Sequence, residues 1–134
     1  MIILLTRILI VDDDAAIGKM LTSVLSDEGY VVEAVQNAKQ AINACEKSPF
    51  DLALIDLVLP DTKGTELLNI LKKIQPEMVR IIITGHPSLE SAMKTFNQGA
   101  DGYILKPFEV TELLEKIRNK RILDLEAKLC EILV

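Results

Sequence analysis

The sequence has few aromatic residues and few cysteines. Only 4% of its 134 residues are aromatic and none is tryptophan, so a core must be built from aliphatic side chains. The two cysteines, Cys45 and Cys130, lie far apart without CxxC or metal-ligand spacing. This spacing excludes a cysteine-held metal site and indicates unpaired thiols in a reducing compartment.

Long apolar runs and an excess of basic residues are also absent. The apolar start, residues 1–5, is soon interrupted by Arg7 and carries no cleavage-like site, and no run reaches the length of a membrane span. The net charge of −5 argues against a general nucleic-acid-binding surface. We therefore expect a cytoplasmic chain that makes no direct contact with nucleic acid or membrane.

Short apolar runs alternate regularly with segments of helical periodicity. Strands are predicted over residues 7–11, 30–35, 52–55, 79–83 and 102–105. Each is followed by a segment whose apolar residues recur at helical spacing. Five alternations with short links predict an α/β domain, a doubly wound five-stranded parallel sheet flanked by five helices.

Caps and breakers give the helix boundaries. Asp14 and Asn37 are predicted N-caps, and Gly29 and Gly99 are predicted to close helices. The other helices are predicted to begin at Gly64, at Pro87-Ser88 and at Glu109. Four apolar residues of the fourth helix are predicted to face the core: Leu89, Ala92, Met93 and Phe96.

Polar or charged side chains stand at the ends of four of the five strands. They are Asp12 and Asp13, Asp56, Thr84 and Lys106. In a parallel sheet these ends meet at one edge, where ligands bind. Neighbouring carboxylates repel unless a cation joins them, and hard oxygen ligands suit Mg²⁺. Singly, each residue can be a strand terminator or a cap, but together they predict a site for Mg²⁺ and a phosphoryl group.

Four motifs resemble those of the receiver domains of two-component response regulators, the family of the chemotaxis regulators. They are Ile8-Leu-Ile-Val-Asp-Asp-Asp14, Leu54-Ile-Asp-Leu-Val-Leu-Pro60, Ile82-Ile-Thr-Gly85 and Ala100-Asp-Gly-Tyr-Ile-Leu-Lys-Pro-Phe108. The resemblance covers about residues 6 to 120. It implies the flavodoxin-like receiver fold and a part in a phosphorelay.

The resemblance also implies a role for each residue at the strand ends. Asp56 would be the phosphoacceptor, taking a phosphoryl group from the phosphohistidine of a histidine kinase or a phosphotransfer protein. Asp12 and Asp13 would anchor Mg²⁺, with Asp56 and the backbone carbonyl of Val58 completing the protein ligands. Such a domain catalyses only its own phosphorylation and dephosphorylation, so we do not expect an enzyme in the usual sense.

Further positions of the resemblance concern the phosphorylated state. Thr84 would hydrogen-bond the phosphoryl oxygen, Lys106 would pair with it, and Tyr103 would be the switch aromatic that alters the surface of helix four, strand five and helix five. The bond from Lys106 to Pro107 would be cis. Val58 and His86 occupy two further positions of the family, two residues after the acceptor and two residues after the threonine. In the family these two positions tune dephosphorylation. Because valine cannot orient a water molecule by hydrogen bonding, we expect slow dephosphorylation.

Three alternatives compete with this interpretation. A haloacid-dehalogenase-like phosphatase also places Asp-x-Asp after a buried strand, here Asp12 to Asp14, but it needs a later acidic pair beside the site. A flavodoxin-like FMN binder needs a hydroxyl- and glycine-rich phosphate loop where this chain has three aspartates. The third alternative is a receiver-like interaction module that is never phosphorylated.

The end of the chain continues the last helical pattern. We expect the receiver domain in residues 1–120 and a helical extension in residues 121–134. Four residues of the extension, spaced three, four and three apart, are Ile122, Leu125, Leu129 and Ile132. This spacing is the seam of a coiled coil, so the extension either associates with a second copy, as a phosphorylation-linked homodimer, or folds back on its own domain. No output-domain motif follows, and the downstream partner is not predicted.

Overall fold

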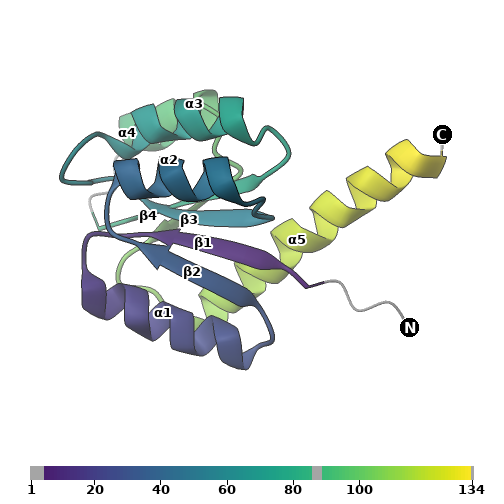
Figure 1. The fold of residues 1–134 in the computed structure, drawn as a ribbon, viewed down its shortest axis with the longest axis horizontal. Coiled ribbons are helices and arrows are strands. Elements are labelled where there is room, and N and C mark those ends of the chain that lie inside the picture. Colours follow the sequence, from purple (N-terminus) through teal and green to yellow (C-terminus); the bar gives the residue numbers. More distant parts are fainter. Residues whose placement is uncertain (1–4, 86–88, 134) are drawn as a thin grey trace.

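The structure is a computed structural model that describes residues 5–85 and 89–133. Strands and helices alternate throughout (Figure 1). In chain order the elements are β1 (Arg7–Val11), α1 (Ala15–Asp27), β2 (Val31–Val35), α2 (Ala38–Lys47), β3 (Leu52–Asp56), α3 (Gly64–Ile74), β4 (Val79–Thr84), α4 (Leu89–Asn97), β5 (Gly102–Leu105) and α5 (Val110–Leu133). The predicted strands agree with these bounds to within one residue at each end.

All neighbouring strands of the sheet are parallel, in the order β2-β1-β3-β4-β5. Figure 1 shows α1 and α5 on one face of the sheet and α2, α3 and α4 on the other. This confirms the predicted doubly wound, five-stranded sheet with five helices. Because the chain passes from β2 at one edge to β3 on the other side of β1, the ends of β1 and β3 lie side by side.

Two aliphatic cores fill the space between the sheet and its helices. Alternate residues of β1 and β3 point to opposite faces, so Leu9 and Ala53 join the core under α2 and α3, whereas Ile8 and Leu52 join the core under α1 and α5. Every residue of β3 is buried, as expected for a central parallel strand covered on both faces. The site described below therefore stands on a rigid strand pair.

The predicted helix caps are present. Asp14 accepts backbone hydrogen bonds from Ala16 and Ile17, and Asn37 accepts one from Gln40. Gly29 and Gly99 end α1 and α4 with φ of 95° and 102°, a region that favours glycine. Local sequence alone therefore fixes these four helix ends.

The predicted inner face of α4 is wrong at two positions. Met93 and Phe96 are 57% and 49% exposed, whereas Thr95 is fully buried. The Phe96 ring lies over that of Tyr103, with centroids 6.4 Å apart, instead of entering the core. The predicted start at Pro87-Ser88, and the side chains of Leu89 and Ala92, lie outside the described part of the chain.

Helix α5 has two parts with different surroundings. Its first half packs on the sheet through Leu113 and Ile117, both fully buried. Its second half extends beyond the rest of the molecule, with Ile122, Leu129 and Ile132 exposed (Figure 1). The extension therefore does not fold back on its own domain in this structure. Within the described residues, no helix is both long and apolar enough to cross a membrane.

Candidate functional site

Strands β1 and β3 deliver two carboxylates to the same point at the edge of the sheet. Val11 pairs with Ile55 in the parallel register, so Asp12 and Asp56 follow at adjacent strand ends. Both residues are buried. Asp12 is held by its backbone N–H, which donates to Val35 O, and by its Oδ1, which accepts from Asp14 N at 2.9 Å. Burying two carboxylates side by side is costly, which indicates a function rather than a structural role.

Asp13 completes an acidic cluster with these two residues. Carboxylate oxygens of Asp12, Asp13 and Asp56 all lie within 4.8 Å of one another. Three hard oxygen donors at this spacing suit a divalent cation such as Mg²⁺. The sequence predicted these three residues together, and the structure brings them together.

Lys106 reaches the acidic cluster from the end of β5. Its Nζ lies 2.9 Å from Asp12 Oδ2 and 3.2 Å from Asp56 Oδ2. Its backbone N–H donates to the carbonyl of Thr84, the last residue of β4, at 2.7 Å. The peptide bond from Lys106 to Pro107 is cis. Lys106 and Thr84 therefore lie at the same edge of the sheet as the carboxylates. This placement was predicted from their positions at the ends of strands.

The charges of the site alter the pKa of Asp56 and of Lys106. Burial raises the pKa of Asp56 and the charge of Asp12 adds to this, although the Val58 N–H and Lys106 lower it in part. Burial alone would lower the pKa of Lys106, but the hydrogen bond and charge of Asp12, and then those of Asp56, outweigh burial and raise the pKa. Lys106 is therefore held as a cation between two carboxylates.

The loop from β3 to α3 wraps closely around Asp56. Val58 N donates to Asp56 Oδ1 at 3.1 Å, while the Val58 side chain is exposed. Gly64, the first residue of α3, comes so near that an added Cβ would lie 2.7 Å from the backbone oxygen of Asp56. A larger residue at position 64 would push the loop away from Asp56.

Asp61 holds the same loop from the other side. Its two carboxylate oxygens accept backbone hydrogen bonds from Ala38 at 2.9 Å and Lys39 at 3.0 Å, in the first turn of α2. These bonds lower the pKa of Asp61. Sequence reasoning missed this residue, because the helix that it caps lies more than twenty residues earlier and no local pattern links the two.

Tyr103 in β5 is half-buried and packs against the core under α2 and α3. Its hydroxyl group is buried and has no hydrogen-bond partner among the described residues. A buried hydroxyl without a partner is unfavourable. His86, predicted near the site, lies outside the described residues.

Comparison with known proteins identifies the family. The family model described as "Response regulator receiver domain" matches residues 8–118. The chain belongs to this family. The haloacid-dehalogenase-like and FMN-binding alternatives therefore do not apply to this receiver domain.

Relatives of this receiver domain include full regulators and single domains. It is 31% identical over 128 residues to the transcriptional regulatory protein PcoR of Escherichia coli, covering 94% of this chain and 57% of PcoR. The chain spans about half the length of the curated relatives it matches.

Two solved structures extend the comparison. A CheY-like response regulator receiver domain protein from Methanospirillum hungatei JF-1 is 44% identical, with a TM-score of 0.90, covering 92% of this chain and 99% of that one. A response regulator from Burkholderia pseudomallei, crystallised with a phosphorylated aspartic acid, calcium ion and citrate, is 25% identical. Its TM-score is 0.78, and the match covers 89% of this chain and 74% of that one.

Proposed function

We propose that this receiver domain accepts a phosphoryl group on Asp56 from the phosphohistidine of a histidine kinase or a phosphotransfer protein. One observation carries the proposal: Asp56 alone ends the central strand β3 and faces both Asp12 and Lys106. The similar response regulator from Burkholderia pseudomallei, which contains a phosphorylated aspartic acid, supports it. We place this domain in residues 1–120 and a helical extension in residues 121–134, with the boundary inside α5.

The residues around Asp56 are suited to an in-line phosphoryl transfer. One Asp56 oxygen is fixed by Val58 N and the other by Lys106, so the carboxylate is oriented before the donor arrives. Lys106 can move from the carboxylates to the incoming phosphoryl oxygens without leaving the site. Catalysis then consists of positioning and charge stabilisation.

A divalent cation fits the acidic cluster. Asp12, Asp13 and Asp56 would hold it, with the backbone carbonyl of Val58 as a further ligand. Mg²⁺ would neutralise charge on the transferring phosphoryl group. This assignment rests on the donor set, which consists of hard oxygens with no nitrogen or sulfur among them.

Phosphorylation would change the surface through Thr84 and Tyr103. A phosphoryl group adds nearly two negative charges beside Asp56, which would draw the Thr84 hydroxyl and Lys106 toward it. The buried hydroxyl of Tyr103 has no hydrogen-bond partner among the described residues, and its side chain would move inward after Thr84. This movement of Tyr103 would alter the surface of α4, β5 and α5. This surface would regulate a downstream effector and would also serve phosphorylation-linked pairing of two copies. We place the protein in the cytoplasm.

Labelling by a small phosphodonor tests the proposal. Acetyl phosphate with Mg²⁺ should add one phosphoryl group, detected by intact-mass spectrometry, and EDTA should prevent it. Asp56→Asn should abolish labelling. Asp14→Asn is the matched control, because Asp14 is adjacent in sequence to the acidic pair but caps α1, and asparagine preserves that cap. Labelling of the Asp56→Asn variant at the wild-type level would refute the assignment, and an unlabelled wild type would favour a non-phosphorylated interaction module.

A further inference from the structure

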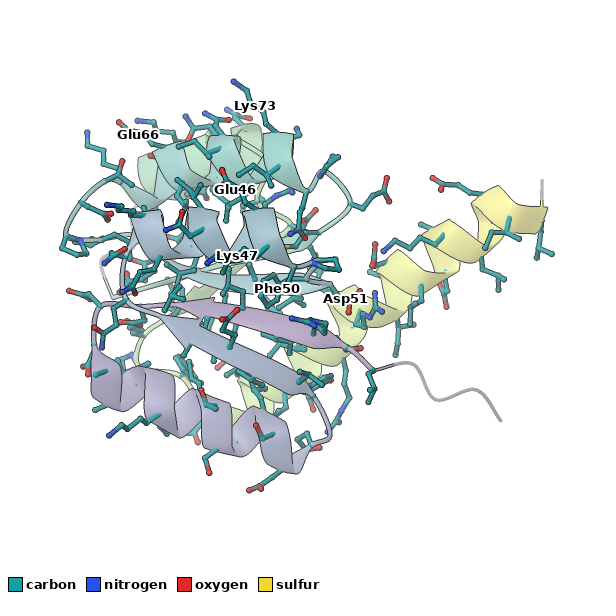
Figure 2. All side chains as sticks on the ribbon, viewed as in Figure 1. Glu46, Lys47, Phe50, Asp51, Glu66 and Lys73 are labelled. Atoms are coloured by element: carbon teal, nitrogen blue, oxygen red, sulfur yellow. The ribbon has the colours of Figure 1, made fainter. Side chains whose placement is uncertain are left out.

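The loop between β3 and α3, residues 57–63, is loosely packed on its outer side. A hollow of about 780 Å³ runs along this loop, between Lys94 of α4 and exposed Glu66 in the first turn of α3, among the described residues (Figure 2). Leu59 is buried, and the remaining loop residues are at least partly exposed. A loop with so little packing depends on hydrogen bonds to keep its backbone in one position.

The base of this loop is closed by two hydrogen bonds. Gly64 N donates to Leu57 O at 2.9 Å, which joins the beginning of the loop to the beginning of α3. Val58 N donates to Asp56 Oδ1 at 3.1 Å. The tip of the loop, residues 59–62, lies beyond both bonds and needs a support of its own.

Asp61, in the tip of the loop, reaches across to a different helix. Its Oδ1 accepts from Ala38 N at 2.9 Å and its Oδ2 accepts from Lys39 N at 3.0 Å. The free N–H groups and the dipole at the N-terminus of a helix both favour a carboxylate there. We call Asp61, Ala38 and Lys39 the loop brace.

Helix α2 also has a cap of its own. Asn37, the N-cap, accepts from Gln40 N at 2.8 Å. Gln40 Oε1 in turn accepts from Gln36 N at 2.8 Å, so the start of the helix is closed reciprocally by local residues. The loop brace is a second set of acceptors from a distant part of the chain, and its particular effect is on the loop that carries Val58.

The start of α2 is fixed relative to the acidic cluster. Strand β2 ends at Val35, whose backbone oxygen accepts from Asp12 N at 3.1 Å. Helix α2 begins shortly afterwards, at Ala38. The loop brace therefore links Asp12, through the end of β2 and the first turn of α2, to the loop that follows Asp56.

We propose that Asp61 is a positioning residue for the metal site, which holds the backbone of Val58 beside the acidic cluster before Mg²⁺ binds. The inference rests on the proposed function, in which the Val58 carbonyl is a ligand. Asp61 is not one of the three carboxylates of the cluster, so it acts through the loop. A ligand that is fixed in advance loses less conformational freedom when the ion binds, and the affinity for the ion is higher.

Titration of the unphosphorylated protein with Mg²⁺, followed by NMR shifts of backbone amides, tests this role. Asp61→Ala removes both acceptors and should raise the dissociation constant about tenfold, the lower end of the range for residues that support metal ligands. Asp61→Asn keeps one oxygen and should have an intermediate affinity. Asn37→Ala is the matched control, because it removes a hydrogen bond from the same helix turn and leaves the loop brace intact. This control should bind Mg²⁺ as wild type does, even where it lowers the unfolding midpoint as much as Asp61→Ala.

Hydrogen exchange of the Val58 amide gives a readout without any metal. This amide donates to Asp56, so its exchange rate reports how often the loop moves away from the carboxylate. In Asp61→Ala without Mg²⁺, the Val58 amide should exchange about threefold faster or more. Asn37→Ala should keep the wild-type rate.

Ala38→Pro breaks the loop brace from its other side. Ala38 is the first residue of α2, a position that tolerates proline, and Asn37 before it has the extended backbone that suits a residue preceding proline. The substitution deletes the N–H that donates to Asp61 Oδ1, so Mg²⁺ binding should weaken. Combined with Asp61→Ala it should weaken binding little further, because both changes act on one contact.

The results separate this inference from the proposed function. Equal Mg²⁺ affinity of wild type and Asp61→Ala, or an equal loss in Asn37→Ala, would overturn the positioning role while phosphorylation of Asp56 could still be observed. Fully additive effects of Ala38→Pro and Asp61→Ala would overturn it as well. A wild type that binds no Mg²⁺ would overturn the metal assignment of the proposed function and the positioning role together.

Discussion

Partly buried charged side chains meet at both ends of the parallel sheet, but the ratio of acidic to basic groups differs between the two ends. At the carboxyl ends of the strands, three carboxylates of the acidic cluster face one ammonium group, that of Lys106. At the amino ends, Arg121 pairs with Asp51 and with Asp124, and Lys128 also pairs with Asp124. This Arg121 network sets two carboxylates against two cations. The first end has an excess of negative charge and the second end is balanced.

This difference distinguishes the proposed phosphorylation site from a network of structural ion pairs. A balanced network needs nothing further and holds α5 against β1 and β3. An unbalanced cluster is costly in the free chain, and that cost is relieved when a cation binds. Changes at the amino end should therefore alter stability, and changes at the carboxyl end should alter phosphorylation.

Arg121→Met should have the largest effect on stability. It removes the guanidinium group that pairs with the carboxylates of both Asp51 and Asp124. We expect the free energy of unfolding to fall by about 2–3 kcal/mol, below the full value for a buried pair because Asp51 is partly open to water. Urea denaturation measures this change.

A surface pair supplies the control for Arg121→Met. Arg118 lies 3.3 Å from Glu28, and both side chains are exposed. Arg118→Met should therefore lower the free energy of unfolding by at most about 0.5 kcal/mol. Phosphorylation of the Arg121→Met variant should match wild type under conditions where both are folded. Equal losses from the two arginine variants would show that the Arg121 network is not structural.

Lys106→Met should have the largest effect on the reaction. It removes the only cation seen beside Asp56 in the described residues, and with it one stabilising partner of the transferring phosphoryl group. We expect phosphorylation by acetyl phosphate at saturating Mg²⁺ to slow on the order of a hundredfold. Lys73→Met, on the exposed surface of α3 (Figure 2), should leave the rate unchanged. A wild-type rate in the Lys106→Met variant would remove Lys106 from the mechanism.

Val58→Asn should affect the lifetime of the phosphorylated state. The exposed Val58 side chain belongs to the residue two after Asp56, the proposed acceptor, and it cannot orient an attacking water by hydrogen bonding. Wild type should therefore lose its phosphoryl group over many minutes. An asparagine amide can orient that water, and the loss should become several-fold faster, a barrier change of about 1 kcal/mol. The rate of phosphoryl loss in each protein is measured by following the labelled protein after the donor is removed, with and without EDTA. A half-life of seconds in wild type, or the same decay in both proteins, would mean that another group places the water.

Asp61→Asn should produce the smallest effect, and one that depends on pH. Because backbone hydrogen bonds lower the pKa of Asp61 in the folded state, its carboxylate stabilises the fold above the ordinary aspartate pKa. That contribution is lost as the pH falls through the lowered pKa. The difference in unfolding midpoint between wild type and variant should thus be greatest near neutral pH and shrink in acid. A difference that grows in acid would contradict the role of the charge.

The acidic cluster and Lys106 could be predicted because these residues belong to strand ends. Asp12, Asp56 and Lys106 each follow a short apolar run, and parallel topology brings such ends together wherever the strands fall in the sequence. The helix caps at Asp14 and Asn37 could be predicted because their partners lie within three residues.

The remaining features depend on contacts that no local pattern encodes. Asp61 binds a helix turn more than twenty residues away, and Arg121 bonds Thr6 across 115 positions. The burial of Thr95 in place of Met93 and Phe96 depends on how α4 is rotated over Tyr103. Helical periodicity shows that a face is apolar, but the neighbouring elements decide how much of that face is buried.

The contact between Thr6 and Arg121 also bears on the order in which the chain can fold. Strand β1 is made first, yet it lies inside the sheet between β2 and β3, and its residues Ile8 and Ile10 belong to the same core as Leu113 and Ile117 of α5. Ile8 and Ile10 therefore lack their full cover until residues near Ile117 have been synthesised. Long loops must therefore close before β1 is fully buried. Closing long loops slows folding and makes it cooperative. A nascent chain that stops before α5 should remain open to proteolysis throughout.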